Sequence, residues 1–546
     1  MKQLTGFLIF IVVVFILSGC SSGTDGEFFT DYGLNEGDVI RIEITGTYKN
    51  TEWLVGQKYK AAALDTETTM QLSLVGYDVE GNSNSTLTAT WSSSDQKVAI
   101  VDNTGKITAI SAGEAEVTVK LMSSITEEII SDTIVITVLP SPVTGKQWTV
   151  TTTYSLPQAI WDHASAIWNS HIYVAGGHSS CTPVSYKDCG FTDKVYYAPI
   201  NKTDGSIGKF IQTAILPSYL RGHALLAYNG YLYIIGGIVQ PTFPEPPYPD
   251  PANFETILNE KVYYARVNTD GSLGKWEQTA SLPPPEVRDP PIAADKAGLF
   301  ALSATVHTIS KDGKDKGYIY VTGGWSAELK KNVKTVLVGP INEVDRPDAS
   351  PGSIEKWIHN DLSDLPDDYD GLSKHTSVAA SVNGNNYIYV IGGNSGNYGS
   401  QIFHNEILYA KVAEDGILTE TEQDGILSTW HYASASLHEK LIDHASVSIG
   451  RYIFVLGGRN GVEGSNDEEE YKKFKEVVYF YIDDTGDLQS LQRSVDLPEP
   501  LFHHAAVADI NIAADPINFY LTGGAGGNTA DPDNRKNTVH HFRSTQ

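Results

Sequence analysis

The sequence has few cysteines and few basic residues for its length. Three cysteines occur in 546 residues, and lysine and arginine number 39 against 66 aspartates and glutamates. The resulting formal net charge of −27 repels nucleic-acid phosphates and anionic lipid surfaces, so we expect no nucleic-acid partner. We interpret the acidity as a well-hydrated surface rather than a cation site. With 41% apolar residues, the chain can bury large cores.

The N-terminal apolar run, Phe7–Leu17, is shorter than the roughly 20 residues that span a bilayer, but it suits a signal-peptide core. The Leu-Ser-Gly-Cys at Leu17–Cys20 resembles the lipobox of bacterial lipoproteins. The resemblance implies a signal peptide at 1–19, a lipidated Cys20 and a protein anchored by lipid to the bacterial cell envelope, at the outer membrane or cell surface and outside the cytoplasm. An uncleaved anchor helix with a chance cysteine is the alternative.

The remaining cysteines are Cys181 and Cys189. On an exported chain they favour a disulfide that closes a short surface loop. A metal pair is the weaker alternative, because no third and fourth ligand of matching spacing lies nearby. Residues 20–37, which are rich in Ser, Gly, Thr and Asp, predict a flexible tether after the lipidated cysteine.

Residues 38–140 predict a β-sandwich. Short strand-like runs, such as the alternating Val39–Ile44, are separated by Gly, Asn and Asp turns. The sequence closely resembles the bacterial immunoglobulin-like group 2 domain at Trp91–Asp95, Val98–Asp102, Gly105–Ala109 and Ala112–Val119. The resemblance implies a spacer or adhesion module of surface proteins, without catalysis.

A repeated unit fills the rest of the chain. Each copy has an apolar run that ends in a glycine pair, and the pairs begin at Gly176, Gly236, Gly323, Gly392, Gly457 and Gly523. Aromatic and β-branched runs with tight turns and no helical stretch predict a β-propeller. Each pair ends a strand with no helix after it, so we interpret the glycines as backbone features and not as a phosphate cradle.

The segment Gly145–Pro157 matches the end of a unit, whereas the sixth unit stops after Asn537–Phe542. We therefore predict that the N-terminal strand completes the last blade and removes open sheet edges. Residues 145–546 resemble the kelch-repeat, galactose oxidase-like propellers, a group that includes sialate mutarotase. The predicted fold class is all-β: an Ig-like β-sandwich followed by a six-bladed kelch-type β-propeller closed by an N-terminal strand.

The connections after each glycine pair and between blades should share one face of this propeller, which we call the insertion face. It collects the long insertions, so we expect recognition there. Trp325 directly follows Gly323 and Gly324 on that face and is the best single candidate for stacking on a ligand. In contrast, we assign blade packing to the tryptophans that recur at one repeat position, Trp148, Trp276, Trp357 and Trp430.

Five predicted blades begin their innermost strand with histidine, and Ser303 takes the corresponding place in the third. These candidates for ligand binding are His163, His223, His375, His444 and His504. A metal or anion site is one hypothesis, because Asp162 and Asp443 precede two of them. We favour the other, in which each histidine makes the same inter-blade hydrogen bond, since a ligand seldom needs one group from nearly every blade.

No catalytic motif stands out, and Arg221, Arg288 and Arg459 are too scattered to assign to a carboxylate clamp. We assign no catalytic residue, no cofactor and no metal, and the acidic run Asp467–Glu470 does not match an EF-hand. The predicted function is a surface lipoprotein that binds or adheres to a glycan or protein through the insertion face. The alternative is a carbohydrate-active periplasmic enzyme of the sialate mutarotase type. An enzyme should show convergent polar groups with perturbed ionisation at the channel mouth, and an adhesin an exposed aromatic or apolar patch.

Overall fold

The computed structural model describes residues 41–543 apart from the following segments: 49–50, 53–59, 66–68, 79–81, 85–86, 111–112, 123–128, 140–147, 152–153, 180–189, 240–256, 286–292, 312–313, 345–349, 383, 397–400, 424–425, 462–471, 490, 510–516 and 527–534. The predicted signal peptide, tether, Cys20, Cys181, Cys189 and Arg288 therefore lie outside the described residues, as does the acidic run. The chain divides into two compact units between residues 142 and 143. The described residues contain no helix long and apolar enough to cross a membrane.

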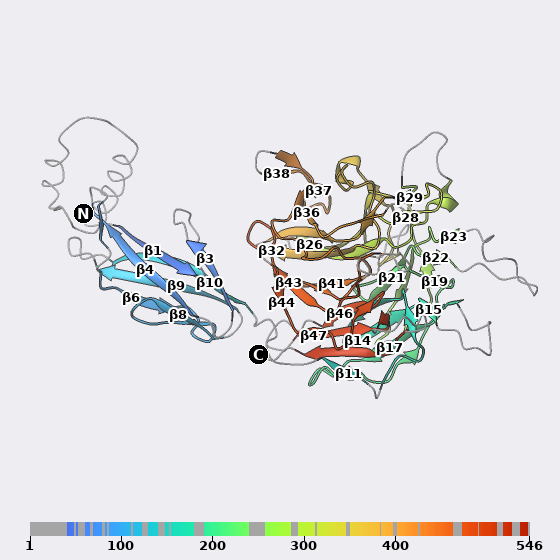
Figure 1. Cartoon of the computed structure of the whole chain (residues 1–546), viewed down its shortest axis with the longest axis horizontal. Helices are drawn as coiled ribbons and strands as arrows, with labels where there is room; N and C mark the ends of the chain where they lie inside the picture. The colour runs from blue at the N-terminus through green and yellow to red at the C-terminus, as the bar shows by residue number, and fades with distance from the viewer. Residues whose placement is uncertain are drawn as a thin grey trace, which may run out of the picture. The chain divides into compact units, whose positions relative to one another are not determined.

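The first unit is a sandwich of two sheets (Figure 1). Its core comes from alternate residues of facing strands, and Ile44, Leu72, Ile107 and Ile136 are at most 2% exposed. One sheet contains β2 (Thr51–Glu52), β1 (Arg41–Tyr48), β4 (Thr69–Tyr77), β8 (Lys106–Ala109) and β7 (Ala99–Val101), with β5 (Ser83–Asn84) beside β4. The other contains β3 (Lys60–Asp65), β10 (Ile129–Leu139), β9 (Gly113–Met122) and β6 (Thr90–Ser93).

The second unit contains six antiparallel sheets that we call the blades, together with smaller sheets of two or three strands. Blade 1 contains β13 (Ala164–Trp168), β14 (His171–Ala175), β17 (Val195–Pro199) and β18 (Ile211–Gln212). Blade 2 contains β20 (Ala224–Tyr228), β21 (Tyr231–Ile235), β24 (Tyr263–Arg266) and β25 (Glu277–Gln278). Blade 3 contains β26 (Ser303–Lys311), β27 (Lys314–Thr322), β30 (Val336–Pro340) and β31 (Ile358–His359). Blade 4 contains β32 (Thr376–Val382), β33 (Asn385–Ile391), β36 (Ile407–Val412) and β37 (Leu418–Thr419). Blade 5 contains β41 (Ala445–Ile449), β42 (Tyr452–Leu456), β43 (Val477–Tyr481) and β44 (Gln492–Arg493). Blade 6 contains β46 (Ala505–Asp509), β47 (Asn518–Thr522), β49 (Val539–Arg543) and β11 (Thr149–Thr151).

The ring closes as the sequence predicts. Strand β11 pairs antiparallel with β49, so the last blade contains both ends of the propeller chain. The innermost strands contact one another in order, and β46 returns to β13. Blade 4 differs in one respect, because the hairpin β38 (Thr421–Gln423) and β39 (Ile426–Ser428) divides its outer strand into β37 and β40 (Trp430–Tyr432). The predicted all-β fold class is confirmed.

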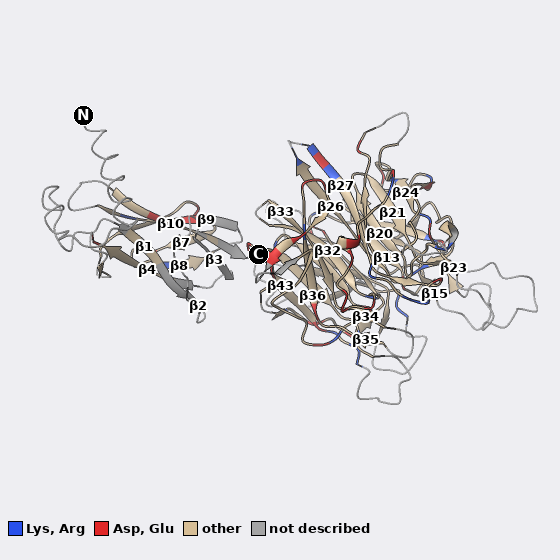
Figure 2. Cartoon of the chain, turned by 90° about the horizontal axis from the view of Figure 1, so that it is seen from above, with Lys and Arg blue, Asp and Glu red and all other residues tan. Residues whose placement is uncertain are grey.

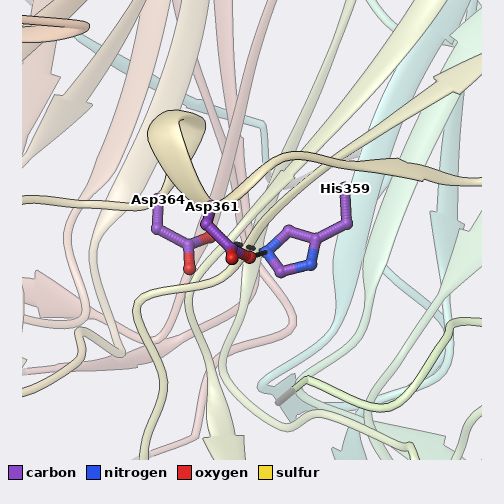
Figure 3. A group of neighbouring side chains, drawn as sticks. All are labelled: His359, Asp361 and Asp364. Atoms are coloured by element: carbon purple, nitrogen blue, oxygen red, sulfur yellow. Dashed lines mark hydrogen bonds and ion pairs between the residues drawn. The ribbon is translucent and has the colours of Figure 1, made fainter. Parts of the chain in front are cut away.

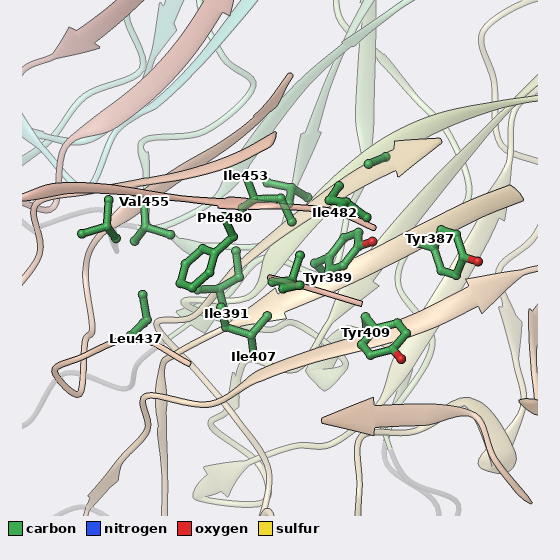
Figure 4. Close-up of a cluster of buried hydrophobic side chains, with 14 of the residues drawn as sticks. Tyr387, Tyr389, Ile391, Ile407, Tyr409, Leu437, Ile453, Val455, Phe480 and Ile482 are labelled. Atoms are coloured by element: carbon green, nitrogen blue, oxygen red, sulfur yellow. The ribbon is translucent and has the colours of Figure 1, made fainter. Parts of the chain in front are cut away.

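Apolar side chains fill the space between adjacent blades. In Figure 4, Tyr389 and Ile391 from blade 4 face Ile453 and Phe480 from blade 5, and all four are fully buried. Most charged residues lie instead in loops and at strand ends (Figure 2). The four repeated tryptophans each donate an indole N–H to a carbonyl of the preceding blade, as Trp357 Nε1 does to Ala280 at 2.9 Å. Their predicted role in blade packing is confirmed.

A second set of side-chain bonds links each blade to the next. Tyr173, Tyr320, Tyr389 and Tyr520 occupy one position on the second strands, and each hydroxyl donates to a turn glycine of the following blade at 2.7–2.9 Å. Blade 5 has Phe454 at this position. The sixth blade has no turn between its third and fourth strands, because the fourth strand comes from the other end of the chain. No turn carbonyl exists there to accept a tyrosine hydroxyl.

Two circles of backbone hydrogen bonds join the blades around the axis. In the outer circle, the second glycine of every pair donates to a carbonyl of the next blade at 2.7–2.8 Å, and the last, Gly524, donates to Ile160 of blade 1. Gly177 shows why glycine is needed, because a Cβ there would lie 2.8 Å from the His163 Cβ and its φ is +99°.

The inner circle is made by one residue from each blade, immediately before the position that five histidines occupy. Each N–H donates to the carbonyl of its counterpart in the preceding blade, from Gly222 to Asp162 and onward until Asp162 donates to His503. The six inner-ring residues are Asp162, Gly222, Ala301, Lys374, Asp443 and His503.

Tyr389→Phe should lower the free energy of unfolding of the propeller by about 1–3 kcal/mol, because the Gly486 carbonyl loses its buried donor. The matched control is Tyr233→Phe, since Tyr233 occupies the same position but its buried hydroxyl has no hydrogen-bond partner in the described part of the chain. That variant should be neutral or more stable. Urea unfolding of both variants measures the difference, and equal losses would contradict the role given to the hydroxyl.

Candidate binding site at the channel mouth

The inner ring places charged side chains where the innermost strands begin. All six of its residues have φ between 52° and 60°, a left-handed conformation that costs non-glycine residues about 1 kcal/mol or more. Four of the six are Asp, Lys or His. Strain of this kind persists where surrounding bonds enforce it, and it often marks functional sites. Here the circle of backbone hydrogen bonds enforces it.

These side chains form an ionic cluster with two arginines from neighbouring positions. His503 Nδ1 lies 2.6 Å from Asp162 Oδ1 and 3.2 Å from Asp443 Oδ1. Arg459 Nε donates to Asp443 at 2.7 Å, whereas Arg221 Nη1 lies 3.4 Å from Asp162. Lys374 is 3.8 Å from Asp443. We call these residues the mouth cluster: Asp162, Arg221, Lys374, Asp443, Arg459 and His503.

Both carboxylates of the mouth cluster stay ionised at neutral pH. Burial by itself raises the pKa of Asp443, but the charges of His503, Lys374 and Arg459 outweigh it and lower that pKa to about 2. Burial likewise opposes the ionisation of Asp162, and His503 and Arg221 hold its pKa well below the usual range. The arrangement is a fixed set of charges.

Aromatic rings surround the mouth cluster. Trp161 lies edge-on to His503, with ring centroids 4.8 Å apart. The Arg221 guanidinium lies 4.9 Å from the centroid of Phe191 and 5.7 Å from that of Phe300, and Arg459 lies 5.3 Å from Phe502. The backbone of Trp325 pairs with that of Phe300, so the predicted stacking residue lies beside this group, and it is partly buried. Its role as a ligand contact remains a prediction.

The five predicted histidines lie directly after the inner ring and are buried. Three of them bond to a threonine hydroxyl of the preceding blade: His163 to Thr522, His375 to Thr322 and His444 to Thr376, at 2.8–2.9 Å. The sequence predicts this inter-blade hydrogen bond for all five histidines, and three of them make it.

His223 and His504 lack such a bond. The two nearby positions that offer threonine to the other three hold Ala164 and Ala175 for His223, and Ala445 and Leu456 for His504. Neither ring has a hydrogen-bonding side chain among the described residues. The described histidines of this set also form no group with closely spaced metal-ligand atoms.

The expectation that Ser303 matches these histidines is wrong by one residue. Leu302 follows the inner-ring residue Ala301, and its Cβ faces Gly324 as the histidine Cβ atoms face the other second glycines. A leucine fills the same buried volume without a hydrogen bond. The adjacent Ser303 begins the strand, and its hydroxyl oxygen accepts hydrogen bonds from the Ser377 N–H at 2.7 Å and from the Ser377 hydroxyl at 2.8 Å.

The sequence singled out Asp162 and Asp443 but missed His503 and Lys374. Both residues could have been found by reading one position in every repeat, the residue directly before the histidine position. All the residues at this position belong to the inner ring. The sequence also left Arg221 and Arg459 unassigned, and the structure brings each of them to one carboxylate. Arg288 lies outside the described residues.

The opposite mouth of the channel contains a cavity of about 560 Å³. It is lined by residues of the innermost strands, including Trp168 and Asp509, and by the side chains of Lys202 and Arg543. Burial raises the pKa of Asp509 despite the nearby Lys202. The sequence did not predict this cavity, because its lining comes from several blades.

Comparison with known proteins supports the assignment of the first unit as an Ig-like domain. A family model for the bacterial Ig-like domain, group 2, matches residues 49–127. This confirms the resemblance found at Trp91–Val119. No curated protein matches the chain. Among solved structures, one titled "Structure of YjhT" is 14% identical, covers 71% of this chain and 95% of its own, and has a TM-score of 0.43. The propeller is established here by its own strand order.

His504→Leu should reduce the acid sensitivity of the propeller. Burial lowers the pKa of His504 to about 3, whereas an unfolded histidine titrates near 6.5. Below pH 6.5, His504 is protonated in the unfolded chain but stays neutral in the folded chain. The free energy of unfolding therefore falls as the pH decreases from 6.5 toward 3. At pH 5 the variant should gain on the order of 2 kcal/mol relative to the wild type, beyond any difference at pH 8.

The leucine should fit, since Leu302 occupies the same position in blade 3. His375→Leu is the comparison, because it also loses the bond to Thr322 and should be less stable even at pH 8. Urea unfolding at pH 5 and pH 8 measures both variants. An unchanged pH dependence in His504→Leu would exclude its protonation as a cause of acid unfolding.

Proposed function

We propose that this chain is a lipid-anchored binding protein of the bacterial cell envelope whose insertion face recognises a negatively charged glycan. The observation that carries the proposal is the composition of the mouth cluster. Three cations, Arg221, Lys374 and Arg459, face two carboxylates, so the cluster is formally positive in a chain of net charge −27. A positive site on an acidic protein favours an anionic ligand.

The exposure of the cations supports binding from the outside. Arg459 and both carboxylates are at most 10% exposed, whereas the side chains of Arg221 and Lys374 are each 26% exposed. The two outer cations are thus positioned to meet a ligand, while the buried ions hold them in place. Trp161, Phe300 and Trp325 lie beside the cluster and are partly exposed, and aromatic rings of this kind can pack against the apolar face of a sugar ring.

The ionisation of the cluster favours binding over acid–base catalysis. Polar groups with perturbed pKa values do converge here, which is a feature expected of an enzyme. However, both aspartate pKa values move away from neutrality, and a general base works best with a pKa near the operating pH. The carboxylates therefore serve as fixed counter-charges. The mutarotase-type enzyme remains the second candidate because of the convergence itself.

Arg221→Gln should weaken glycan binding by about 10-fold to 100-fold, the loss of one charge-assisted hydrogen bond. Trp325→Ala should weaken it through lost stacking. Arg543→Gln is the matched control, because this arginine lies at the opposite channel mouth. The measurement is a glycan array with neutral and acidic sugars, with and without calcium, probed with the detergent-solubilised full chain and followed by titration of the hits.

A blank array with all proteins folded would contradict glycan binding and direct the search to protein partners. Equal effects of Arg221→Gln and Arg543→Gln would contradict the position of the site. If an acidic sugar binds and its anomers equilibrate faster in the presence of the chain, by NMR, the enzyme alternative replaces simple binding.

Cys20→Ser should abolish the lipid anchor. The wild-type chain, expressed in a bacterium, is expected to incorporate labelled palmitate and to stay with the membrane fraction, whereas the variant should incorporate none. Cys181→Ser is the control, because that cysteine lies outside the lipobox. Label that persists in Cys20→Ser would contradict the lipobox interpretation.

A further inference from the structure

A second group of ionisable side chains lies at the outer edge of blade 3. His359 ends strand β31, and Asp361 and Asp364 follow in the short 3-10 helix η4 (Asp361–Ser363) and directly after it. The imidazole Nε2 is 3.0 Å from Asp364 Oδ1 and 3.9 Å from Asp361 Oδ1. One ligand atom from each residue lies within 4.8 Å of the others. Figure 3 shows the ring and both carboxylates directed toward one point.

The segment that holds these side chains is fixed at both ends. His359 pairs with Leu337 in the sheet, and the Asn360 side chain caps η4 by accepting from the Leu362 N–H at 3.1 Å. At the other end, the Leu365 N–H donates to Lys334, and the Leu365 side chain is 1% exposed. The backbone therefore holds the three residues close together, and none of them has a long, flexible side chain.

The Asp364 carboxylate is itself oriented. Its Oδ1 accepts the Val336 N–H at 3.0 Å, and its side chain is only 13% exposed. An outer hydrogen bond that fixes a ligating carboxylate is a regular feature of metal sites. Asp361 is 94% exposed and can adjust its position by rotation of its side chain.

The comparison with the mouth cluster separates the two histidine groups. There, His503 also lies between two carboxylates, but Arg221, Lys374 and Arg459 neutralise them. In the described part of the chain, neither Asp361 nor Asp364 forms an ion pair with a lysine or arginine. The edge group therefore has two negative charges facing one imidazole, an arrangement that favours a cation.

We propose that His359, Asp361 and Asp364 bind a divalent transition-metal ion, with zinc as the preferred ion and water completing its coordination. Zinc takes imidazole nitrogen and carboxylate oxygen at about 2.0–2.2 Å, which places neighbouring ligand atoms about 3.3 Å apart in a tetrahedral site. The separations of 3.0 and 3.9 Å bracket that value. A ligand set that includes imidazole favours zinc over calcium, which prefers oxygen ligands alone. The site is independent of the glycan proposal.

Isothermal titration of the metal-free, untagged, full-length chain with zinc chloride tests the site. The thiols are alkylated beforehand, so that cysteines do not contribute. The wild-type chain should bind zinc at this site. Asp361→Asn and His359→Gln should each weaken that binding by at least about 10-fold. Asp361 is so exposed that its substitution leaves the fold intact, which keeps the test valid if His359→Gln is unstable.

Asp367→Asn is the matched control. Asp367 lies three residues after Asp364, is 93% exposed and pairs with Lys334, so its loss makes the same change of charge outside the trio. Zinc affinity within about twofold of the wild type is expected for this variant. If Asp361→Asn and Asp367→Asn weaken zinc binding equally, the proposal is overturned. Zinc affinity would then depend on the net negative charge of the surface and not on the three residues. Calcium binding that is as tight as zinc binding and unaffected by His359→Gln would overturn it as well.

Discussion

The propeller depends on the two circles of backbone hydrogen bonds that join its blades around the axis. A blade alone is a small twisted sheet with two open edges and two apolar faces. The glycine pairs let the backbone of each blade approach the next closely enough to bond, since a Cβ on Gly176 would lie 2.7 Å from the Leu220 carbonyl oxygen of blade 2. The tryptophan and tyrosine bonds farther from the axis then fix the angle between neighbours. Both circles return to blade 1, so they close only when all six blades are in place. Each inter-blade contact therefore depends on the others.

The same constraint creates the candidate binding site. The inner ring holds one residue of each blade in a left-handed conformation, which places five side chains and one glycine at the channel mouth. The hydrogen bonds of the ring are made by backbone atoms alone, so the side chain at each position can change with little effect on closure. Asp443 and His503 illustrate this freedom, since their counterparts in blades 2 and 3 are glycine and alanine. Function can therefore vary at these positions while the scaffold stays constant.

The sequence predicts the fold well because the fold repeats. Each glycine pair, tryptophan and Asp-Gly turn is a local signal, and six imperfect copies reinforce one another. The sequence predicted only part of the mouth cluster. Arg221, Lys374 and His503 come from different blades, and their side chains meet only when the ring closes. The one-residue error at Ser303 arose because a polar residue was matched to histidine, whereas buried volume decided the position in favour of Leu302. His359, Asp361 and Asp364 were missed because a 3-10 turn is needed to bring their side chains together.

The closing strand β11 has a mechanical consequence. The chain enters the propeller at this strand, so any pull on the N-terminal part of the protein reaches the ring through β11 before any other element. The load falls on the pairs that Thr149–Thr151 make with β49 and on the Trp148 indole bond to Val495. Under tension, the strand that completes the last blade is therefore the part of the ring that carries the load first, whereas each of the other five blades is built from continuous chain.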